Sequence, residues 1–233
     1  MSIAIVPARG GSKGILRKNL ALINGKSLVE LAVGSAIDSG MFESVYLDTD
    51  DEEIAQIGKS AGAIVPFLRS PDLATDEAGI LDCVRHFCAQ IGEEAIPPGV
   101  SIALLQPTNP LRTVKEIVDC LEIWEKNGGN FSVVAVAEPM QSAKDFVKIE
   151  SDGSCQTLSG QNFRVTNRQS LPSVKFISGS IYVFTRDFLD FHGQLVTEKN
   201  TIFFETSQQS SLDVDTEFDL HIVRLLSKNL FDG

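Results

Sequence analysis

Short apolar runs alternate with segments of helical length, and this alternation constrains the fold more than any other feature of the chain. Buried strands are expected where an apolar run is too short for a helix, at residues 3–6, 45–47, 63–67, 100–105 and 131–137. Helices are expected between them, at residues 27–39, 54–61, 78–91 and 113–126. Strands that alternate with helices pair in parallel through right-handed crossovers. The sequence therefore predicts an α/β fold with a mostly parallel sheet flanked by helices.

Residues 140–175 differ in amino-acid composition from the chain before them. The segment is mixed in composition, too long for a simple connection and too polar for a core. Residues 151–153 predict a hairpin turn within it. Beyond it we expect strands at 181–184 and 201–204 and a last helix at 217–226. We therefore expect a single domain over residues 1–233, with an insertion that forms a lid or an arm packed against another subunit.

The overall charge and the cysteines restrict the class of protein. The formal net charge is −11, from 20 basic and 31 acidic side chains, which argues against a nucleic-acid or anionic-membrane surface. No apolar run approaches the ~20 residues of a membrane-spanning helix, and no basic region precedes the short apolar run at the N-terminus. The four cysteines are scattered without a CxxC pair, as reduced core thiols would be. We expect a cytoplasmic protein with neither nucleic acid nor membrane as a partner.

The first strand leads into a loop rich in glycine and positive charge. Pro7 ends the strand because it has no N–H to donate. The next residues contain three glycines and four cations, namely Arg9, Lys13, Arg17 and Lys18. Glycines let several backbone N–H groups point at one anion, and the cations add charge around it. The sequence predicts a polyphosphate site here rather than an ordinary surface turn.

Two carboxylates near the other end of the chain, Asp213 and Asp215, stand two residues apart. On an extended segment they point to one side, while apolar Leu212 and Val214 point to the other. Such a pair suits a hard divalent cation such as Mg²⁺. Mg²⁺ beside a cationic phosphate loop is typical of phosphoryl or nucleotidyl transfer. The alternative is that both side chains cap the following helix.

Three stretches in the same order along almost the whole chain carry a resemblance to a known family. They read VPARGGSKG at residues 6–14 with Lys18 and Asn19 behind it, LQPTNPLR at 105–112 and LDVDTEFDL at 212–220. Together they resemble the signature stretches of the acylneuraminate cytidylyltransferases. These are the CMP-sialic acid synthetases and their legionaminate and pseudaminate relatives.

The resemblance implies a Rossmann-like nucleotidyltransferase fold, with the projecting segment building a homodimer. It implies an enzyme that joins CTP to a nine-carbon 2-keto sugar acid, giving CMP-sugar and pyrophosphate with Mg²⁺ as cofactor. The anomeric hydroxyl of the sugar would attack the α-phosphorus of CTP. Positioning and positive charge around the leaving pyrophosphate would lower the barrier.

The resemblance also assigns roles to particular residues. Arg9, Lys18 and Asp215 are expected to act in catalysis, and Asp213 with Asp215 is expected to hold Mg²⁺. The other residues expected at the substrates are Ala8, Gly10, Gly11, Ser12 and Lys13 at the triphosphate, Asn19 at the nucleotide, Gln106 at the sugar, Lys144 and Arg168 near the sugar acid, and Arg69.

Four positions depart from the family pattern. Leu16 replaces a usual proline, Gly79 and Ile80 stand where serines contact cytosine, and Phe176 beside Lys175 replaces an arginine. These departures favour a less polar di-N-acetylated sugar, legionaminate or pseudaminate, at least as much as N-acetylneuraminate. Two rival functions stay open at this point. One is a glycosyltransferase of similar fold that uses residues 213–215 as a metal-binding DxD motif, and the other is a non-catalytic nucleotide-binding protein.

Overall fold

A six-stranded sheet forms the centre of the molecule in the computed structural model, which describes residues 1–75, 77–141, 146–157 and 174–231. Its strand order is β10-β6-β9-β5-β1-β4. The bounds are β1 Ser2–Pro7, β4 Ser44–Asp48, β5 Ser101–Leu104, β6 Ser132–Ala137, β9 Phe176–Thr185 and β10 Thr201–Glu205. β9 runs antiparallel to both of its neighbours, and the other pairs are parallel. The expected α/β fold with a mostly parallel sheet is confirmed.

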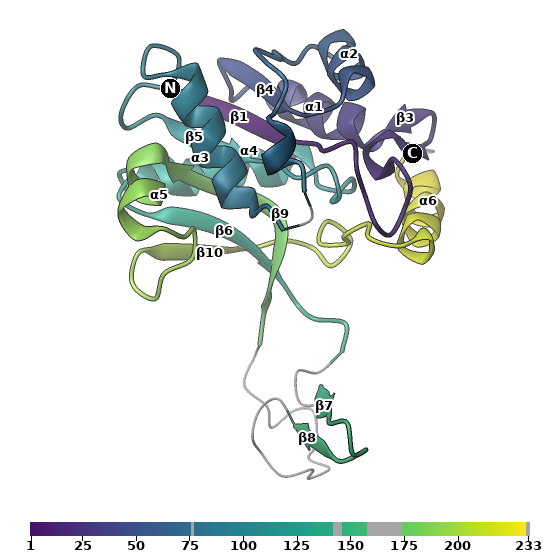
Figure 1. Cartoon of the computed structure of the whole chain (residues 1–233). Coiled ribbons are helices and arrows are strands. Elements are labelled where there is room, and N and C mark those ends of the chain that lie inside the picture. The colour runs from purple at the N-terminus through teal and green to yellow at the C-terminus, as the bar shows by residue number, and fades with distance from the viewer. Residues whose placement is uncertain (76, 142–145, 158–173, 232–233) are drawn as a thin grey trace.

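Helices cover both faces of this sheet (Figure 1). Their bounds are α1 Leu28–Asp38, α2 Glu52–Ser60, α3 Ile80–Ile91, α4 Val114–Lys126, α5 Arg186–His192 and α6 Glu217–Phe231. One core cluster joins α1, α2 and α4 to one face of the sheet, and a second joins α3 and α5 to the other. Side chains on both faces of the sheet are therefore buried under helices, which explains the continuous apolar runs of its parallel strands.

A third, smaller core cluster lies at one end of the sheet. It packs Ile15 of the glycine-rich loop and Leu28 of α1 against Val214 and the inner face of α6. Short elements complete this region, namely the 3₁₀ helix η1 at Lys18–Leu20 and the hairpin of β2 Leu22–Ile23 with β3 Lys26–Ser27. Burying Ile15 and Val214 together brings the two ends of the chain into one neighbourhood.

Side-chain caps define where three helices begin. Ser27 forms a capping box with Glu30, as its spacing predicts, and Thr113, expected only as a cap, forms one with Glu116. Asp51 accepts a hydrogen bond from the amide of Ile54 and caps α2, which therefore begins two residues earlier than expected.

Three elements differ from the sequence-based expectation. The strand expected at residues 63–67 is wrong, since only Ile64 bridges to Tyr46 and Pro66 then interrupts the hydrogen-bonding pattern. The short helix α5 was not expected, because its seven residues carry few periodic apolar positions. The last helix continues to Phe231 rather than ending near residue 226.

An arm leaves the sheet from the end of β6 and returns into β9 (Figure 1). It carries the antiparallel hairpin of β7 Val147–Ile149 and β8 Cys155–Thr157, with Gly153 at φ 84° in its turn, so the predicted hairpin turn is confirmed. The expected sugar-acid residues Lys144 and Arg168 lie outside the described residues.

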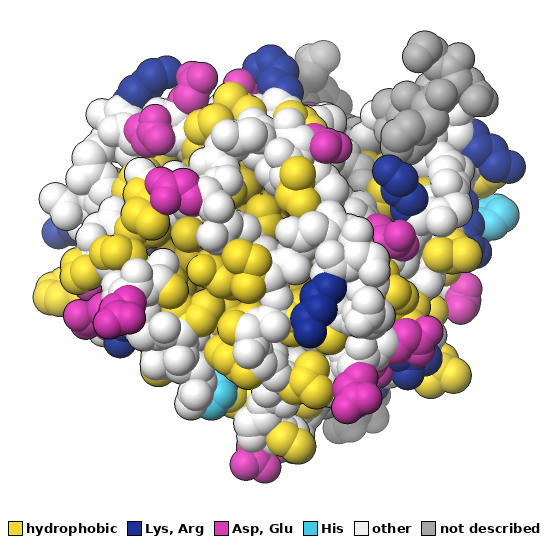
Figure 2. Space-filling model, turned by 90° about the horizontal axis from the view of Figure 1, so that it is seen from above, with side chains coloured by type: hydrophobic (Ala, Val, Ile, Leu, Met, Phe, Trp, Pro, Cys, Tyr) yellow, Lys and Arg dark blue, Asp and Glu magenta, His cyan; other side chains and the backbone are white. Residues whose placement is uncertain are grey.

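The molecular surface seen from above mixes hydrophobic, acidic and basic side chains (Figure 2). On this face Lys and Arg side chains stand singly among Asp and Glu rather than forming a continuous basic field. No helix in the described part of the chain is long and apolar enough to cross a membrane.

Candidate active site

A pocket of about 230 Å³ opens beyond the carboxyl ends of β1 and β5, where ligands bind in open parallel sheets. Its lining gathers residues from three separate stretches of the chain. Predicted residues in it are Arg9, Gly11, Ser12, Lys18, Asn19, Arg69 and Gln106; the others are Pro7, Leu73, Thr75, Ala78, Ile80, Cys83, Pro107 and Thr108. Arg9, Lys18, Asn19 and Gln106 come from the loop and the strand end, and Leu73, Ala78, Ile80 and Cys83 form an apolar wall.

The glycine-rich loop is held in place by the corner between β4 and α2. The amide of Gly10 donates to Oδ1 of Asp50 at 2.9 Å, and a Cβ on Gly10 would lie 2.9 Å from the Cβ of Asp51. The amide of Ala8 donates to the carbonyl of Asp48. Two of the amides expected at the triphosphate, those of Ala8 and Gly10, therefore already have protein partners. Gly11 and Ser12, which are also expected there, line the pocket.

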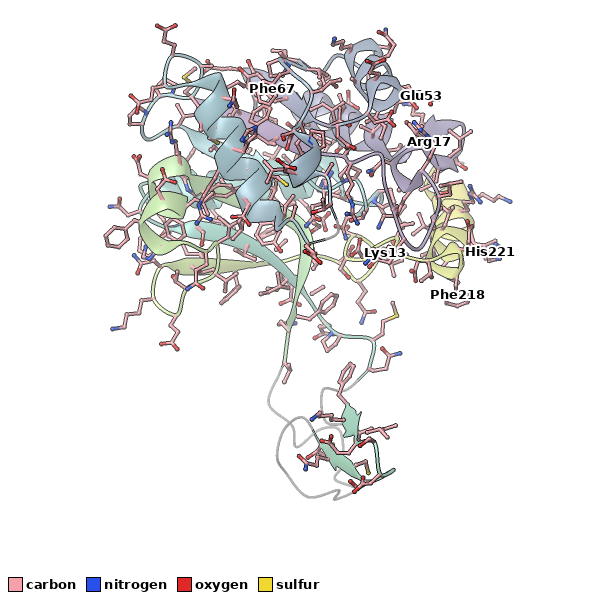
Figure 3. All side chains as sticks on the ribbon, in the orientation of Figure 1. Lys13, Arg17, Glu53, Phe67, Phe218 and His221 are labelled. Carbon is pink, nitrogen blue, oxygen red and sulfur yellow. The ribbon has the colours of Figure 1, made fainter. Side chains whose placement is uncertain are left out.

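Arg17 braces the same loop and does not line the pocket. Its backbone is left-handed at φ 53°, and its guanidinium lies 2.9 Å from carboxylate oxygens of both Asp51 and Glu53. Figure 3 shows Arg17 beside Glu53, with Lys13 at the far end of the loop. Of the four loop cations, Arg9 and Lys18 are the two that line the pocket.

Asn19 offers the pocket an unused acceptor. The residue is buried, and its Nδ2 donates to the carbonyl of Arg9 at 2.9 Å. Its Oδ1 has no hydrogen-bond partner among the described residues. A buried acceptor without a partner costs about 1–3 kcal/mol. A ligand that donates a hydrogen bond to this atom would remove that cost.

Arg69 and Asp48 form a buried ion pair under the apolar side of the pocket. The guanidinium donates to the carboxylate through Nε and Nη2, at distances down to 2.7 Å, and Nη2 also donates to the Asp48 carbonyl. Burial raises the pKa of Asp48 above its ordinary value, although Arg69 opposes that shift. Arg69 itself lines the pocket. Asp48 is therefore a structural partner of a pocket residue rather than part of the lining.

The acidic segment that carries Asp213 and Asp215 touches the cationic loop directly. Nζ of Lys18 lies 2.7 Å from Oδ1 of Asp215. A Cβ on Gly14 would lie 2.0 Å from the carbonyl oxygen of Asp215, so only glycine permits this approach. The amide of Val214 donates to the carbonyl of Thr108 at 2.8 Å. The segment is thus held between the loop on one side and the end of β5 on the other.

Asp213 remains exposed, yet the protein atoms crowded around it, and then the charge of Asp215, raise the pKa of its carboxyl group. Capping of α6 is supplied by other residues. Oδ2 of Asp219 accepts hydrogen bonds from the amides of Asp215 and Thr216, and Oγ1 of Thr216 accepts from the amide of Asp219. The alternative that Asp213 and Asp215 serve as caps is therefore not what the structure shows.

The donor set of this segment fits Mg²⁺ only in partnership with a substrate. Within the described ranges no group of three His, Cys, Asp or Glu side chains is arranged to hold a metal ion. Mg²⁺ is usually bound through one or two carboxylates together with substrate phosphates and water. Asp213 and Asp215, next to the cationic loop, supply the protein's share of such a site.

Sequence reasoning missed two buried donors in the loop after β5, Asn109 and Arg112. Gln106 in the same loop lines the pocket, and its Nε2 donates to the carbonyl of Gly179 at 3.1 Å. Its Oε1 is the atom left for a ligand. The signal that could have found the other two is their spacing, because polar residues recur every third position after a strand that is otherwise apolar.

The apolar wall also contains residues that sequence reasoning did not assign. Ile80, which replaces an expected serine, stands with Ala78 and Cys83 around this end of the pocket. Burial raises the pKa of the Cys83 thiol, so this cysteine stays protonated and unreactive near neutral pH.

The chain is similar over its length to a family of known proteins. A family described as "Cytidylyltransferase" matches residues 3–224. The chain is 31% identical to post-translational flagellin modification protein B of Campylobacter coli, covering 97% of this chain and 94% of that protein. It is also 31% identical to CMP-N,N'-diacetyllegionaminic acid synthase of Legionella pneumophila subsp. pneumophila, covering 93% and 92% of the two chains.

Other relatives are longer or more distant. The chain is 28% identical to N-acylneuraminate cytidylyltransferase of Streptococcus agalactiae serotype V, but it spans only 52% of that protein's length. A solved structure of a CMP:2-keto-3-deoxy-manno-octonic acid synthetase complexed with CTP superimposes with a TM-score of 0.73 at 18% identity, covering 99% of each chain. That likeness confirms the fold.

Proposed function

This chain belongs to the cytidylyltransferase family, and we propose that it joins CTP to a nine-carbon 2-keto sugar acid with release of pyrophosphate. The observation that carries the proposal is the position of Lys18. Its side chain lines the pocket and also forms an ion pair with Asp215. The phosphate loop and the acidic pair therefore meet at one point, as a triphosphate with a bound cation requires.

The two sides of the pocket suit the two ends of CTP. The triphosphate would lie at Arg9, Ser12 and Lys18, where the positive charge is. The base and ribose would lie against the apolar wall, within reach of Oδ1 of Asn19, an acceptor without a partner among the described residues, and of the guanidinium of Arg69 as a donor. A donor beside an acceptor can read the edge of a pyrimidine, which supports cytosine as the base despite the absence of serines at positions 79 and 80.

Catalysis would rest on positioning and on charge. The sugar's anomeric hydroxyl attacks the α-phosphorus and pyrophosphate leaves, with Gln106 orienting the sugar through its free Oε1. Arg9 and Lys18 stabilise the charge that builds on the oxygens of the leaving group. When Mg²⁺ is bound by Asp213 and Asp215 it neutralises further phosphate charge. Each preorganised donor of this kind is worth about 10²–10³ in rate.

The sugar that we propose is a di-N-acetylated nine-carbon acid of the legionaminate or pseudaminate type. A relative matched over nearly its whole length is named a CMP-N,N'-diacetyllegionaminic acid synthase. Phe176 stands where an arginine is expected, and the neighbouring Lys175 is paired with Glu138 and Glu205. Lys175 therefore does not replace the missing charge, which favours a sugar that needs fewer polar contacts.

We also propose that the arm builds a homodimer. Phe146, Val147 and Ile149 on the hairpin side of the arm are exposed, with Ile149 at 72%. Exposed apolar side chains that gather on one projecting segment are typical of an interaction surface. A second copy of this chain is the partner that the arm's shape suits.

A pyrophosphate-release assay tests the activity. CTP, ATP, GTP and UTP are each combined with N-acetylneuraminate, legionaminate, pseudaminate and 3-deoxy-manno-octulosonate, with and without Mg²⁺. We expect release with CTP and one of the two di-N-acetylated acids, and none without the metal. Release with no nucleotide and sugar acid pair, under conditions in which the protein is folded, would contradict the proposed function.

A further inference from the structure

The loop between β5 and α4 places three side-chain donors against consecutive carbonyls of β9. Asn109 Nδ2 donates to Ser178 at 3.4 Å, Gln106 Nε2 to Gly179 at 3.1 Å and Arg112 Nη1 to Ser180 at 2.6 Å. The three donors recur at every third residue of the loop, so one loop is fastened to one stretch of one strand. Asn109 and Arg112 are buried, and neither is among the residues that line the pocket.

Each of the two buried side chains, Asn109 and Arg112, also donates a hydrogen bond to a second backbone carbonyl. Nδ2 of Asn109 lies 3.2 Å from the carbonyl of Leu212, the residue before the acidic pair. Nη1 of Arg112 lies 3.2 Å from the carbonyl of Gln106, at the pocket. Asn109 therefore links β9 to the acidic segment, and Arg112 links β9 to Gln106.

Resting on the proposed function, we propose that these are two positioning residues with separate tasks. Asn109 sets the position of Asp213 and Asp215 for the metal–triphosphate complex, and Arg112 sets the position of Gln106 for the sugar acid. Residues that orient metal ligands from behind typically change metal affinity by about 10–100-fold when they are mutated. A displaced Gln106 would weaken the contact to the sugar without touching the nucleotide.

A purely structural role would not explain why Arg112 is buried, because burying its charge costs free energy of folding. Among the described residues it forms no ion pair, its Nε has no hydrogen-bond partner, and burial lowers its pKa to about 10. A buried charge without a counter-ion destabilises a fold. An apolar side chain of similar size would fill the same space at lower cost but would leave the carbonyls of Gln106 and Ser180 unheld.

The test compares Asn109→Leu with Arg112→Met, so that each variant is the control for the other. Calorimetry measures CTP binding with and without Mg²⁺, and the pyrophosphate assay gives the KM of the sugar acid. Asn109→Leu should lose about tenfold or more of the Mg²⁺-dependent gain in CTP affinity, with metal-free CTP binding and the sugar KM near wild type. Arg112→Met should raise the sugar KM several-fold and leave Mg²⁺-dependent CTP binding intact.

Asn109→Ser and Arg112→Lys replace any variant whose thermal unfolding shows that it is not folded. If both folded variants change the two readouts alike, or change only the melting temperature, the positioning roles are wrong. Wild-type protein is measured first, because a wild type without Mg²⁺-dependent CTP binding would overturn the proposed function itself. A wild type that behaves as proposed, with variants that do not separate, overturns only the positioning roles.

Discussion

At the scale of single residues, the pocket is defined by which polar atoms already have partners. The amides of Ala8 and Gly10 and the guanidinium of Arg17 form hydrogen bonds within the protein, whereas Oδ1 of Asn19 has no partner in the part of the chain that the structure describes. Arg9 donates to the carbonyl of Thr75 across the pocket, so it joins the loop to the apolar wall. The cluster of cations therefore identifies the loop in the sequence, but only the contacts in the folded protein show which of these cations line the pocket.

Replacing Asp215 by Asn should lower kcat of pyrophosphate release by about 10²–10³. The substitution keeps the shape of the side chain but removes the charge that faces Lys18 and the proposed cation. Asp215 is exposed, so the melting temperature should change little. The matched control is Glu217→Gln, which removes one acidic charge from the exposed first turn of α6 and should leave kcat unchanged. Equal turnover of Asp215→Asn and wild type would exclude the metal role.

Replacing Arg9 by Ala should impair use of CTP more than use of the sugar acid. The pocket loses one of its two lining loop cations, and we expect kcat/KM for CTP to fall by about 10²-fold. Steady-state kinetics with each substrate varied in turn measures the effect. Arg85→Ala is the control, because it removes the same charge from a half-exposed side chain of α3 that does not line the pocket. A CTP kcat/KM equal to that of the control variant would rule out phosphate binding by Arg9.

At the scale of elements, the site depends on the contact between a loop near one end of the chain and a segment near the other. The loop meets the acidic segment at Gly14, and Ile15 and Val214 share one small core cluster. Both stretches could be predicted from their composition, because glycines, cations and paired carboxylates carry local chemical signals. Their contact could not be predicted from residue properties alone, since nothing in the spacing of residues tells which strands are neighbours in the sheet.

The elements that were predicted wrongly or only in part lack a clear local pattern. The strand β9 was predicted only over residues 181–184, because its first half contains Ser178, Ser180 and a left-handed Gly179, and its direction cannot be read from the sequence. Residues 63–67 look like a strand, yet Pro66 and the lack of a further partner reduce them to one bridge. Parallel strands and capped helices, by contrast, were predictable because burial on both faces and capping boxes leave clear patterns.

Replacing Gly14 by Ala should separate the loop from the acidic segment. The added Cβ would overlap the carbonyl oxygen of Asp215, which is backbone and cannot turn aside. We expect kcat/KM for CTP to fall by about tenfold or more, because the loop and the carboxylates no longer meet. Gly34→Ala in α1 is the control, since no atom lies within 4 Å of its added Cβ. That control should keep full activity and gain about 0.4–1 kcal/mol of stability.

At the scale of the whole molecule, the sheet and the arm have different roles. The pocket lies beyond the carboxyl ends of β1 and β5, where loops and the start of α3 line it, while the arm extends away from the sheet (Figure 1). Lys175 pairs with Glu138 and Glu205 where the arm meets β6, β9 and β10, so the arm's base is tied to three strands. An arm that is anchored at its base and exposes Phe146, Val147 and Ile149 on its hairpin is suited to hold a second subunit.

Replacing Ile149 by Asp should therefore weaken the proposed homodimer. Ile149 is 72% exposed on the hairpin, and a charge there would have to be desolvated in an apolar interface. Size-exclusion chromatography with light scattering should show the mass of a dimer for wild type and a shift toward monomer for the variant. Phe191→Asp is the control, because Phe191 is 85% exposed in α5 and away from the arm. A wild-type monomer, or equal loss of dimer in both variants, would show that the arm does not build the interface.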